Sequence, residues 1–229
     1  METLHNGFIL EFSDGAFPLS TDSIALSGFV KLPKNAKVLD LGSGCGSLGH
    51  LLCANDPDCQ ITGIELDETA HKTALMNANT NGIDSRFHSI CADMNTISDF
   101  VTPGSFSVCV SNPPYFAAGP QSQKTPLARR EDCCSMDALF RAAAWGLKYG
   151  GSFYLVHRPE RLAELCATGS KYKLEPKRLC LLRHKCDGPI TLLLMECRKG
   201  GKPGIILEEE SLFDAQGNPT PYYQNLYHL

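Results

Sequence analysis

The chain has 229 residues, of which 43% are hydrophobic, so it can bury a complete core within one domain. It has no apolar run of about 18 residues and no charged leader, which predicts a cytoplasmic protein that does not enter a membrane. The 11 cysteines are odd in number, so we expect reduced thiols. Neither Cys-x-x-Cys nor His-x-x-x-His occurs, and we therefore expect no metal site.

Charge is distributed unevenly along the chain. Residues 124–202 hold 16 Lys and Arg against 8 Asp and Glu, a balance of +8. All other residues hold 5 against 17, a balance of −12, and the two sums give the net charge of −4. A basic third can present a positive face to a polyanion, but charge alone leaves an ordinary solvated surface equally open.

Apolar runs alternate with helical patterns from residue 36 onward. We expect strands at 36–42, 59–67, 86–93, 105–112, 152–159, 175–184 and 190–198. We expect helices at 47–55, 67–82, 136–151 and 159–167. This order predicts an α/β, Rossmann-like fold with helices on both faces of a seven-stranded, mostly parallel sheet. The last two strands have no helix between them, so the last strand should be antiparallel.

Two short extensions flank this core, and we expect all three parts to form one domain. Residues 1–35 contain a short strand pair and a helix capped by Ser20 or Thr21. Residues 36–202 form the core, and residues 203–229 carry Gly, Pro and a turn. No linker, repeat or low-complexity tract separates them.

The first core strand runs into the glycine-rich stretch DLGSGCGSLG, which is typical of a nucleotide-binding loop. Gly44-Cys-Gly46-Ser-Leu-Gly49 matches G-x-G-x-x-G, and Glu65 ends the second strand. Glycines let the backbone approach an adenosine ligand, and a carboxylate at that strand end can accept from ribose hydroxyls. These features alone also fit a dinucleotide site or a tight turn. Asp40 completes D-x-G-x-G-x-G, which resembles the loop that class I methyltransferases use for S-adenosyl-L-methionine.

One further acidic residue lies at a strand end. Asp93 follows the third strand, where it can accept from an adenine amino group. Because the loop, Glu65 and Asp93 follow three successive strands, they should meet where the sheet order reverses, which is where such sheets bind ligands. With this cofactor, the product would be S-adenosyl-L-homocysteine.

The fourth strand ends at Asn112-Pro113-Pro114-Tyr115, beside the first strand of such a sheet. The Asn112 side-chain carbonyl and the Pro113 backbone carbonyl can accept both N–H groups of a planar amino group, which directs the nitrogen lone pair at a methyl donor. Pro114 has no N–H to compete. Tyr115 or Phe116 offers a ring on which a base can stack. An edge strand closed by a Pro-Pro turn is the alternative.

The Asn-Pro-Pro-Tyr corner resembles that of amino-methyltransferases that act on adenine N6, guanine N2 or the glutamine amide of release factors. Blocks along nearly the whole chain resemble the bacterial tRNA(Val) adenine N6-methyltransferase family, which methylates the adenosine beside the anticodon. These blocks are GAFPLSTDSIALSGF, VLDLGSGCG, VSNPPYF, ARRED, FYLVHRPERLAEL, LEPKRL and KGGKPG. The resemblance implies a tRNA partner, and we expect a monomer or weak dimer.

The residue patterns, the basic third of the chain and the resemblance together predict residues for three roles. The catalytic residues would be Asn112, Pro113, Pro114 and Tyr115. The cofactor-binding residues would be Thr21, Asp22, Asp40, Gly42, Ser43, Gly44, Gly46, Glu65, Leu66, Asp93, Met94 and Asn112. The RNA-binding residues would be Phe116, Arg129, Arg130, His157, Arg158, Arg161, Lys177 and Arg178. Where the family commonly has Ala-Arg-His-Glu, this chain has Ala-Arg-Arg-Glu, which keeps a cation at that position.

Two other functions are compatible with part of this pattern. A protein glutamine N5-methyltransferase of release-factor type is disfavoured because only about 35 residues precede Val38, whereas such enzymes carry a helical domain there. A non-catalytic module that binds RNA or senses S-adenosyl-L-methionine is disfavoured by the intact Asn-Pro-Pro-Tyr sequence.

Overall fold

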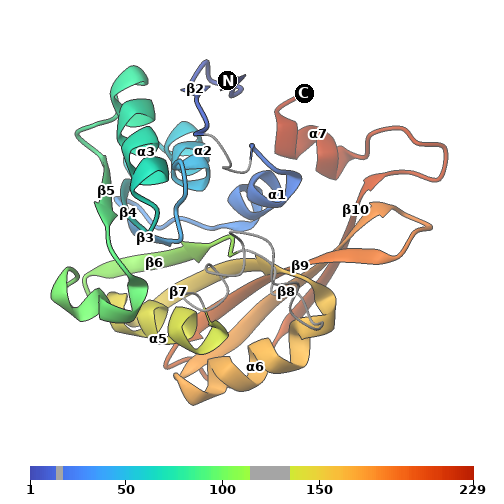
Figure 1. The fold of residues 1–229 in the computed structure, drawn as a ribbon. Coiled ribbons are helices and arrows are strands. Elements are labelled where there is room, and N and C mark those ends of the chain that lie inside the picture. The colour runs from blue at the N-terminus through green and yellow to red at the C-terminus, as the bar shows by residue number, and fades with distance from the viewer. Residues whose placement is uncertain (14–17, 114–134) are drawn as a thin grey trace, which may run out of the picture.

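A computed structural model gives the fold of the chain and describes residues 1–13, 18–113 and 135–229 (Figure 1). Its main sheet has eight strands in the order β10-β8-β9-β7-β6-β3-β4-β5. The strands are β3 (Lys37–Leu41), β4 (Gln60–Glu65), β5 (Phe87–Cys91), β6 (Phe106–Ser111), β7 (Leu147–His157), β8 (Leu174–Lys185), β9 (Ile190–Lys199) and β10 (Ile206–Phe213). Only β9 runs antiparallel to its neighbours, β7 and β8, in this sheet.

Helices cover both faces of the sheet, as the alternating sequence pattern predicts (Figure 1). One face carries α1 (Thr21–Phe29), α2 (Ser47–Asn55), α3 (Glu68–Thr80) and α7 (Pro221–Tyr227). The other face carries α5 (Met136–Gly146) and α6 (Leu162–Lys171). Two 3-10 helices, η1 (Met94–Asp99) and η2 (Pro159–Arg161), and the small pair β1 (Glu2–Thr3) and β2 (Ile9–Leu10) complete the described chain. None of the helices in these described ranges is long and apolar enough to cross a membrane.

Two apolar layers hold the helices on the sheet. Along β7, Tyr154 and Val156 contribute to the layer under α1, α2 and α3, whereas Phe153 and Leu155 contribute to the layer under α5 and α6. Successive side chains of a strand point to opposite faces, so a strand covered on both sides is apolar throughout. This explains why the core strands appear in the sequence as continuous apolar runs.

Most of the expected elements are confirmed with small changes at their ends. Helix α2 spans Ser47–Asn55 as expected, and β8 and β9 form the expected antiparallel hairpin. The largest difference is at Gly146, where α5 ends and β7 begins, several residues before the strand expected at 152–159. Leu147 is fully buried and pairs with Phe106 of β6, so its backbone joins the sheet instead of continuing the helix.

The C-terminal extension adds an eighth strand to the seven expected. Strand β10 pairs in parallel with β8, with Ile206 opposite Arg178, and α7 then packs beside α1. The two ends of the chain lie on the same side of the sheet (Figure 1), and the rings of His5 and His228 stack with centroids 3.6 Å apart. Strand β10 of this extension therefore lies in the same sheet as the strands of the core.

Helix α2 lies close to the sheet because Gly49 has no side chain. A Cβ at Gly49 would lie 2.6 Å from Cε2 of Phe87 and 3.0 Å from Cγ2 of Ile61, and both residues are buried. The third glycine of the loop motif thus sets the helix-to-sheet distance, which is its usual role in such folds.

Gly49→Ala should lower the free energy of unfolding by up to about 2 kcal/mol, because overpacking against two buried side chains costs about 1–3 kcal/mol and the gain in helix propensity offsets about 1 kcal/mol of it. Urea denaturation measures the change. Phe87→Leu in the same background should recover part of the loss. A rise in stability for the single variant would show that the helix does not approach the sheet this closely.

Candidate active site

The carboxyl ends of β3, β4 and β6 lie side by side and bring together the features predicted from the sequence. Asp40 of β3 is in register with Gly63 of β4 on one side and with Val110 of β6 on the other. The glycine loop after β3, Glu65 at the end of β4 and Asn112 after β6 therefore lie along one edge of the sheet. Strand β5 places Asp93 next in this row, since Ala92 N–H donates to the Glu65 carbonyl at 2.9 Å.

The loop after β3 requires glycine at two positions. Gly42 and Gly44 have φ of +72° and +55°, a region that L-residues rarely adopt. A Cβ at either position would meet no atom of the described residues within 4 Å. No described side chain therefore packs against the backbone at these two glycines, and the conformation itself excludes most other residues.

The Glu65 carboxylate is held at the mouth of this loop by two backbone donors. Gly44 N–H donates to Oε2 and Asp67 N–H donates to Oε1, each at 2.8 Å. The side chain of the next residue, Leu66, is 48% exposed, which is high for a leucine beside a polar site. A fixed carboxylate next to an accessible apolar side chain suits a ligand with hydroxyl groups on one part and a planar ring on another.

Asp93 caps η1 at the neighbouring strand end. Its Oδ1 accepts from Asn95 N–H at 2.8 Å and from Asn95 Nδ2 at 3.0 Å, and the side chain is half-buried. The next side chain, Met94, is buried. The capping bonds orient the carboxylate.

Beneath the loop, two polar side chains are buried with atoms that lack partners. Oδ2 of Asp40 and Oγ of Ser43 have no hydrogen bond to any described residue. Burial, and to a smaller extent the charge of Glu65, raises the pKa of Asp40 to about 7, although a backbone N–H of Gly49 opposes this shift. Unpaired buried polar atoms are costly, and a ligand bound at this loop would supply partners for them.

The corner after β6 is in contact with the N-terminal helix α1. Asn112 is half-buried, and its Nδ2 donates to Oγ of Ser23 at 2.9 Å. Ser20 caps the helix by accepting from Ser23 N–H, and Thr21 and Asp22 form the half-buried first turn. The expected capping residue was Ser20 or Thr21, and the structure assigns it to Ser20.

Ser23 is the site residue that the sequence reasoning missed. Nothing in the sequence distinguishes it from Ser27, a buried serine on the same helix whose hydroxyl donates to the Ile24 carbonyl. Pro113, the other described residue of the corner, is buried. The predicted residues Pro114, Tyr115, Phe116, Arg129 and Arg130 lie outside the described residues.

Two of the residues predicted to bind RNA serve the core instead. His157 is 1% exposed, its Nδ1 accepts from Arg158 N–H, and burial is the main cause that lowers its pKa to about 4. It is therefore neutral near pH 7 and has no access to a phosphate. The prediction for Arg178 requires a similar correction, for a different reason.

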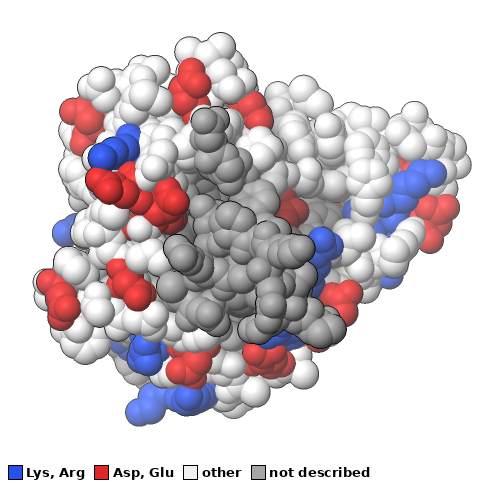
Figure 2. Space-filling model, viewed as in Figure 1, with Lys and Arg blue, Asp and Glu red and all other residues white. Residues whose placement is uncertain are grey.

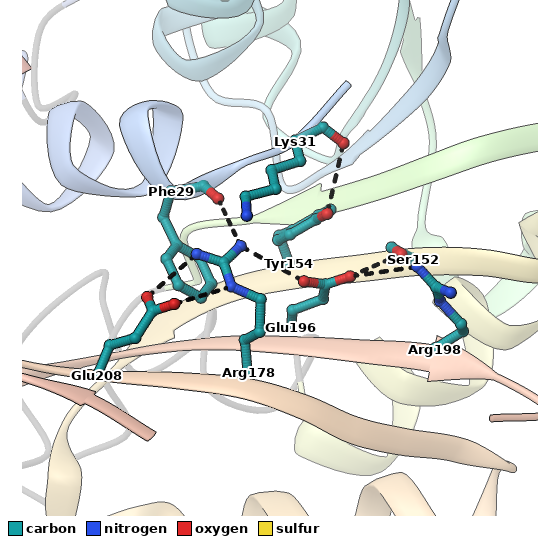
Figure 3. Close-up of polar contacts among 8 residues, drawn as sticks. All are labelled: Phe29, Lys31, Ser152, Tyr154, Arg178, Glu196, Arg198 and Glu208. Carbon is teal, nitrogen blue, oxygen red and sulfur yellow. Dashed lines mark hydrogen bonds and ion pairs between the residues drawn. The ribbon is translucent and has the colours of Figure 1, made fainter. Parts of the chain in front are cut away.

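Arg178 is the centre of a half-buried ion cluster (Figure 3). Its guanidinium makes two hydrogen bonds to Glu208 of β10, at 3.2 and 3.1 Å, and lies 3.5 Å from Glu196 of β9. It also donates to the carbonyl of Phe29, the last residue of α1, and lies over the Phe29 ring at 4.3 Å. Ser152 donates to the other oxygen of Glu196 at 3.0 Å. Arg178 thus joins three strands to α1 and is not available to RNA.

The other described Lys and Arg residues that are predicted to bind RNA also contact their own chain. Lys177 donates to the carbonyls of Lys202 and Gly204, Arg158 donates to the Thr191 carbonyl, and Arg161 pairs with Glu164 at 2.6 Å. On the face shown in Figure 2, Lys and Arg of the described residues form separate groups interspersed with Asp and Glu. Their RNA-binding role stays a prediction.

Metal-binding side chains do not gather in the described ranges. Within residues 1–13, 18–113 and 135–229, no group of three or more His, Cys, Asp or Glu could hold an ion.

Comparison with known proteins identifies the family to which this arrangement belongs. A family model described as methyltransferase small domain matches residues 19–165, more than half of the chain. The chain belongs to this family. The match covers the loop after β3, the ends of β4 and β5, and the corner after β6, so the candidate site lies within the methyltransferase small domain.

Curated members of similar sequence cover most of the chain. The tRNA1(Val) (adenine(37)-N6)-methyltransferase of Shewanella halifaxensis is 34% identical over 175 residues, which are 76% of this chain and 70% of that protein. The protein of the same name from Vibrio parahaemolyticus is 31% identical over 198 residues, 84% of this chain and 80% of that one. These relatives confirm the family resemblance predicted from the sequence.

Solved structures of methyltransferases share the fold. A predicted O-methyltransferase from Agrobacterium tumefaciens has a TM-score of 0.75 at 18% identity and covers 91% of this chain and 96% of its own. Geranyl diphosphate C-methyltransferase from Streptomyces coelicolor A3(2) has a TM-score of 0.58 at 12% identity and covers 77% and 76%. At these identities the likeness shows the fold alone, and it confirms the predicted Rossmann-like methyltransferase fold.

The raised pKa of Asp40 predicts how stability depends on pH. Between the ordinary value of 3.8 and about 7, the unfolded chain ionises this group while the folded chain keeps its proton. The folded state then binds more protons, so this group makes the free energy of unfolding fall as pH rises through that window, and has no further effect above it. Asp40→Asn lacks this contribution. Its stability relative to the unaltered chain should therefore increase from pH 4 to pH 7.

Urea denaturation of both chains at several pH values in this range measures the difference. Asp99→Asn, which removes an exposed carboxylate, is the matched control and should follow the unaltered chain. Parallel pH profiles for Asp40→Asn and the unaltered chain would show that the Asp40 carboxyl ionises normally in the folded protein.

Proposed function

We propose that this chain transfers a methyl group from S-adenosyl-L-methionine to the exocyclic N6 amino group of an adenosine in tRNA, at the position beside the anticodon. The observation that carries the proposal is the Asn112 carboxamide, held half-buried at the end of β6 beside the glycine loop of β3. The choice of adenine N6 and of tRNA is supported by relatives named tRNA1(Val) (adenine(37)-N6)-methyltransferase.

The residues around the loop fit this cofactor. The backbone at Gly42 and Gly44 would accommodate a ligand, the fixed carboxylate of Glu65 would accept from ribose hydroxyls, and exposed Leu66 would contact the adenine. Asp93 would accept from the adenine amino group, with Met94 beneath it. When bound, S-adenosyl-L-methionine supplies an electrophilic methyl group on a positively charged sulfur.

The buried carboxyl of Asp40 also suits a ligand that carries positive charge. Burial disfavours its ionised form, and an adjacent cation favours that form. The unpaired Oδ2 would then gain a favourable electrostatic partner. Asp40 is thus a residue whose charge complements the ligand when the site is filled.

The β6 corner would act on the amino group that receives the methyl. Its nitrogen is a poor nucleophile because the lone pair is delocalised into the adenine ring. Oδ1 of Asn112 and the carbonyl oxygen of Pro113 would each accept one of its N–H groups, which favours a pyramidal nitrogen and orients its lone pair. Preorganised acceptors of this kind stabilise the positive charge that develops on nitrogen, so no general base is needed before attack.

The same proposal gives roles to the two extensions of the chain and implies where the protein acts and in what oligomeric state. Residues 1–35 would close over the cofactor, with Thr21 and Asp22 in the first turn of α1 beside the corner. Residues 203–229 would support that helix through β10 and α7. A tRNA substrate implies action in the cytoplasm, and a monomer or weak dimer suffices for the reaction as proposed.

Methyl transfer from labelled S-adenosyl-L-methionine into bulk tRNA from cells lacking this gene tests the proposal. Nucleoside digestion and mass spectrometry should find the label in N6-methyladenosine. Asn112→Ala should reduce turnover at least about a hundredfold, because it removes an acceptor that acts in the transition state, while affinity for S-adenosyl-L-homocysteine stays within a few-fold. Label in a release factor or ribosomal RNA instead of tRNA would assign the corner to another amino group.

The predicted contribution of Arg129 and Arg130 to RNA binding can be tested separately from methyl transfer. Replacing Arg129 and Arg130 together with Ala should weaken tRNA binding and reduce the slope of log affinity against log salt by about 1–2, since each phosphate contact contributes about 0.9. Lys34→Ala with Lys37→Ala removes the same charge at the exposed amino end of β3, opposite the site, and should leave the slope unchanged. Equal slopes for all variants would place the RNA elsewhere on the chain.

A further inference from the structure

The contact between Ser23 and Asn112 decides which way the Asn112 amide faces. A carboxamide has two orientations of similar shape, related by exchange of its oxygen and its NH2 group. In the structure Nδ2 donates to Oγ of Ser23 at 2.9 Å, so Oδ1 lies on the side away from α1. Ser23 is 6% exposed, which keeps water from competing for this bond.

The Ser23 hydroxyl oxygen accepts a second hydrogen bond, from Ser20. Oγ of Ser20 accepts from Ser23 N–H at 3.2 Å and donates its own hydrogen to Oγ of Ser23 at 3.4 Å. A hydroxyl oxygen has two lone pairs, so the bonds from Ser20 and Asn112 fill both of them. In this arrangement Ser23 faces the NH2 side of the amide.

Helix α1 holds Ser23 in a defined place. Ile24, Ala25, Leu26 and Phe29 are buried between the helix and its neighbours, and α1 contacts α2, β7 and β9. At the far end, Arg178 donates to the Phe29 carbonyl. A hydroxyl on such a helix can orient a side chain that comes from an element 89 residues away.

We propose that Ser23 is a positioning residue that fixes the Asn112 carboxamide with Oδ1 toward the amino group to be methylated. The proposal rests on the proposed function. In the exchanged orientation, the N–H donors of Asn112 would face the N–H donors of the substrate, which repel them. Without the Ser23 hydroxyl, the two orientations become similar in energy and the productive one is populated less.

Kinetics of Ser23→Ala test this role, with Ser27→Ala as the matched control. Ser27 is buried on the same helix, but its hydroxyl bonds the Ile24 carbonyl of its own helix. Ser23→Ala should lower kcat about five- to tenfold, the effect of one lost hydrogen bond, with KM for S-adenosyl-L-methionine within about twofold. Ser27→Ala should leave kcat unchanged. A rise in KM for the cofactor at unchanged kcat would overturn the proposal.

A double variant shows whether Ser23 acts through Asn112. In the Asn112→Ala background the amide is absent, so Ser23→Ala should cause no further loss of kcat. The same five- to tenfold loss in both backgrounds would mean that Ser23 acts through the fold or another group, and the proposal would fail.

A measurement that needs no catalysis separates this proposal from the proposed function. In the protein labelled with 15N at asparagine, the side-chain NH2 signals of Asn112 are identified by their absence from Asn112→Ala. Ser23→Ala should shift one of the two proton signals and accelerate its exchange with water, whereas Ser27→Ala should leave both unchanged. Unchanged signals in Ser23→Ala would overturn the contact even if tRNA is methylated. Changed signals without tRNA methylation would support the contact and refute the proposed substrate.

Discussion

The hydrogen bonds at the two ends of helix α1 connect the candidate active site to the far edge of the sheet. At its N-terminal turn, Ser23 accepts from Asn112, and at its last residue the Phe29 carbonyl accepts from Arg178. The Arg178 side chain is 13% exposed and needs both Glu196 and Glu208, because an unpaired buried charge costs several kcal/mol. The ion cluster therefore helps to hold helix α1 in place. Because Ser23 lies on this helix, the cluster also supports the orientation of the Asn112 amide.

At the carboxyl end of β3, in contrast to the paired charges around Arg178, two buried polar atoms have no partner among the described residues. They are Oδ2 of Asp40 and Oγ of Ser43, which lie beneath the glycine loop. An unsatisfied buried polar atom costs about 1–3 kcal/mol, whereas a buried polar side chain such as Asn77 is bonded. Nε2 of His50, in helix α2 directly after the loop, is also buried without a hydrogen bond to a described residue. The two parts of the site thus differ: the Asn112 amide at the β6 corner is bonded to Ser23, whereas polar atoms beneath the β3 loop have no described partner.

The sequence reasoning succeeded and failed for reasons that individual residues make clear. Glu65 and Asp93 were placed correctly at adjacent strand ends, because the order of elements determines which strand ends meet. Charge and the family resemblance predict RNA contacts for His157 and Arg178, but His157 is buried in the core and the guanidinium of Arg178 is paired with Glu196 and Glu208. Charge in a sequence indicates how many cations a segment holds and does not reveal which of them the fold neutralises.

The sequence by itself determined the features that depend on neighbouring residues: strand and helix periodicity, a glycine-rich loop after the first core strand, and a strand that stops at Asn112. These follow from backbone sterics and the alternation of side chains. Only the tertiary structure decided the addition of β10, the pairing of Ser23 with Asn112 across 89 residues and that of Arg178 with Phe29 across 149. Such partners leave no periodic or local signal, because what brings them together is the burial of apolar faces across the whole sheet.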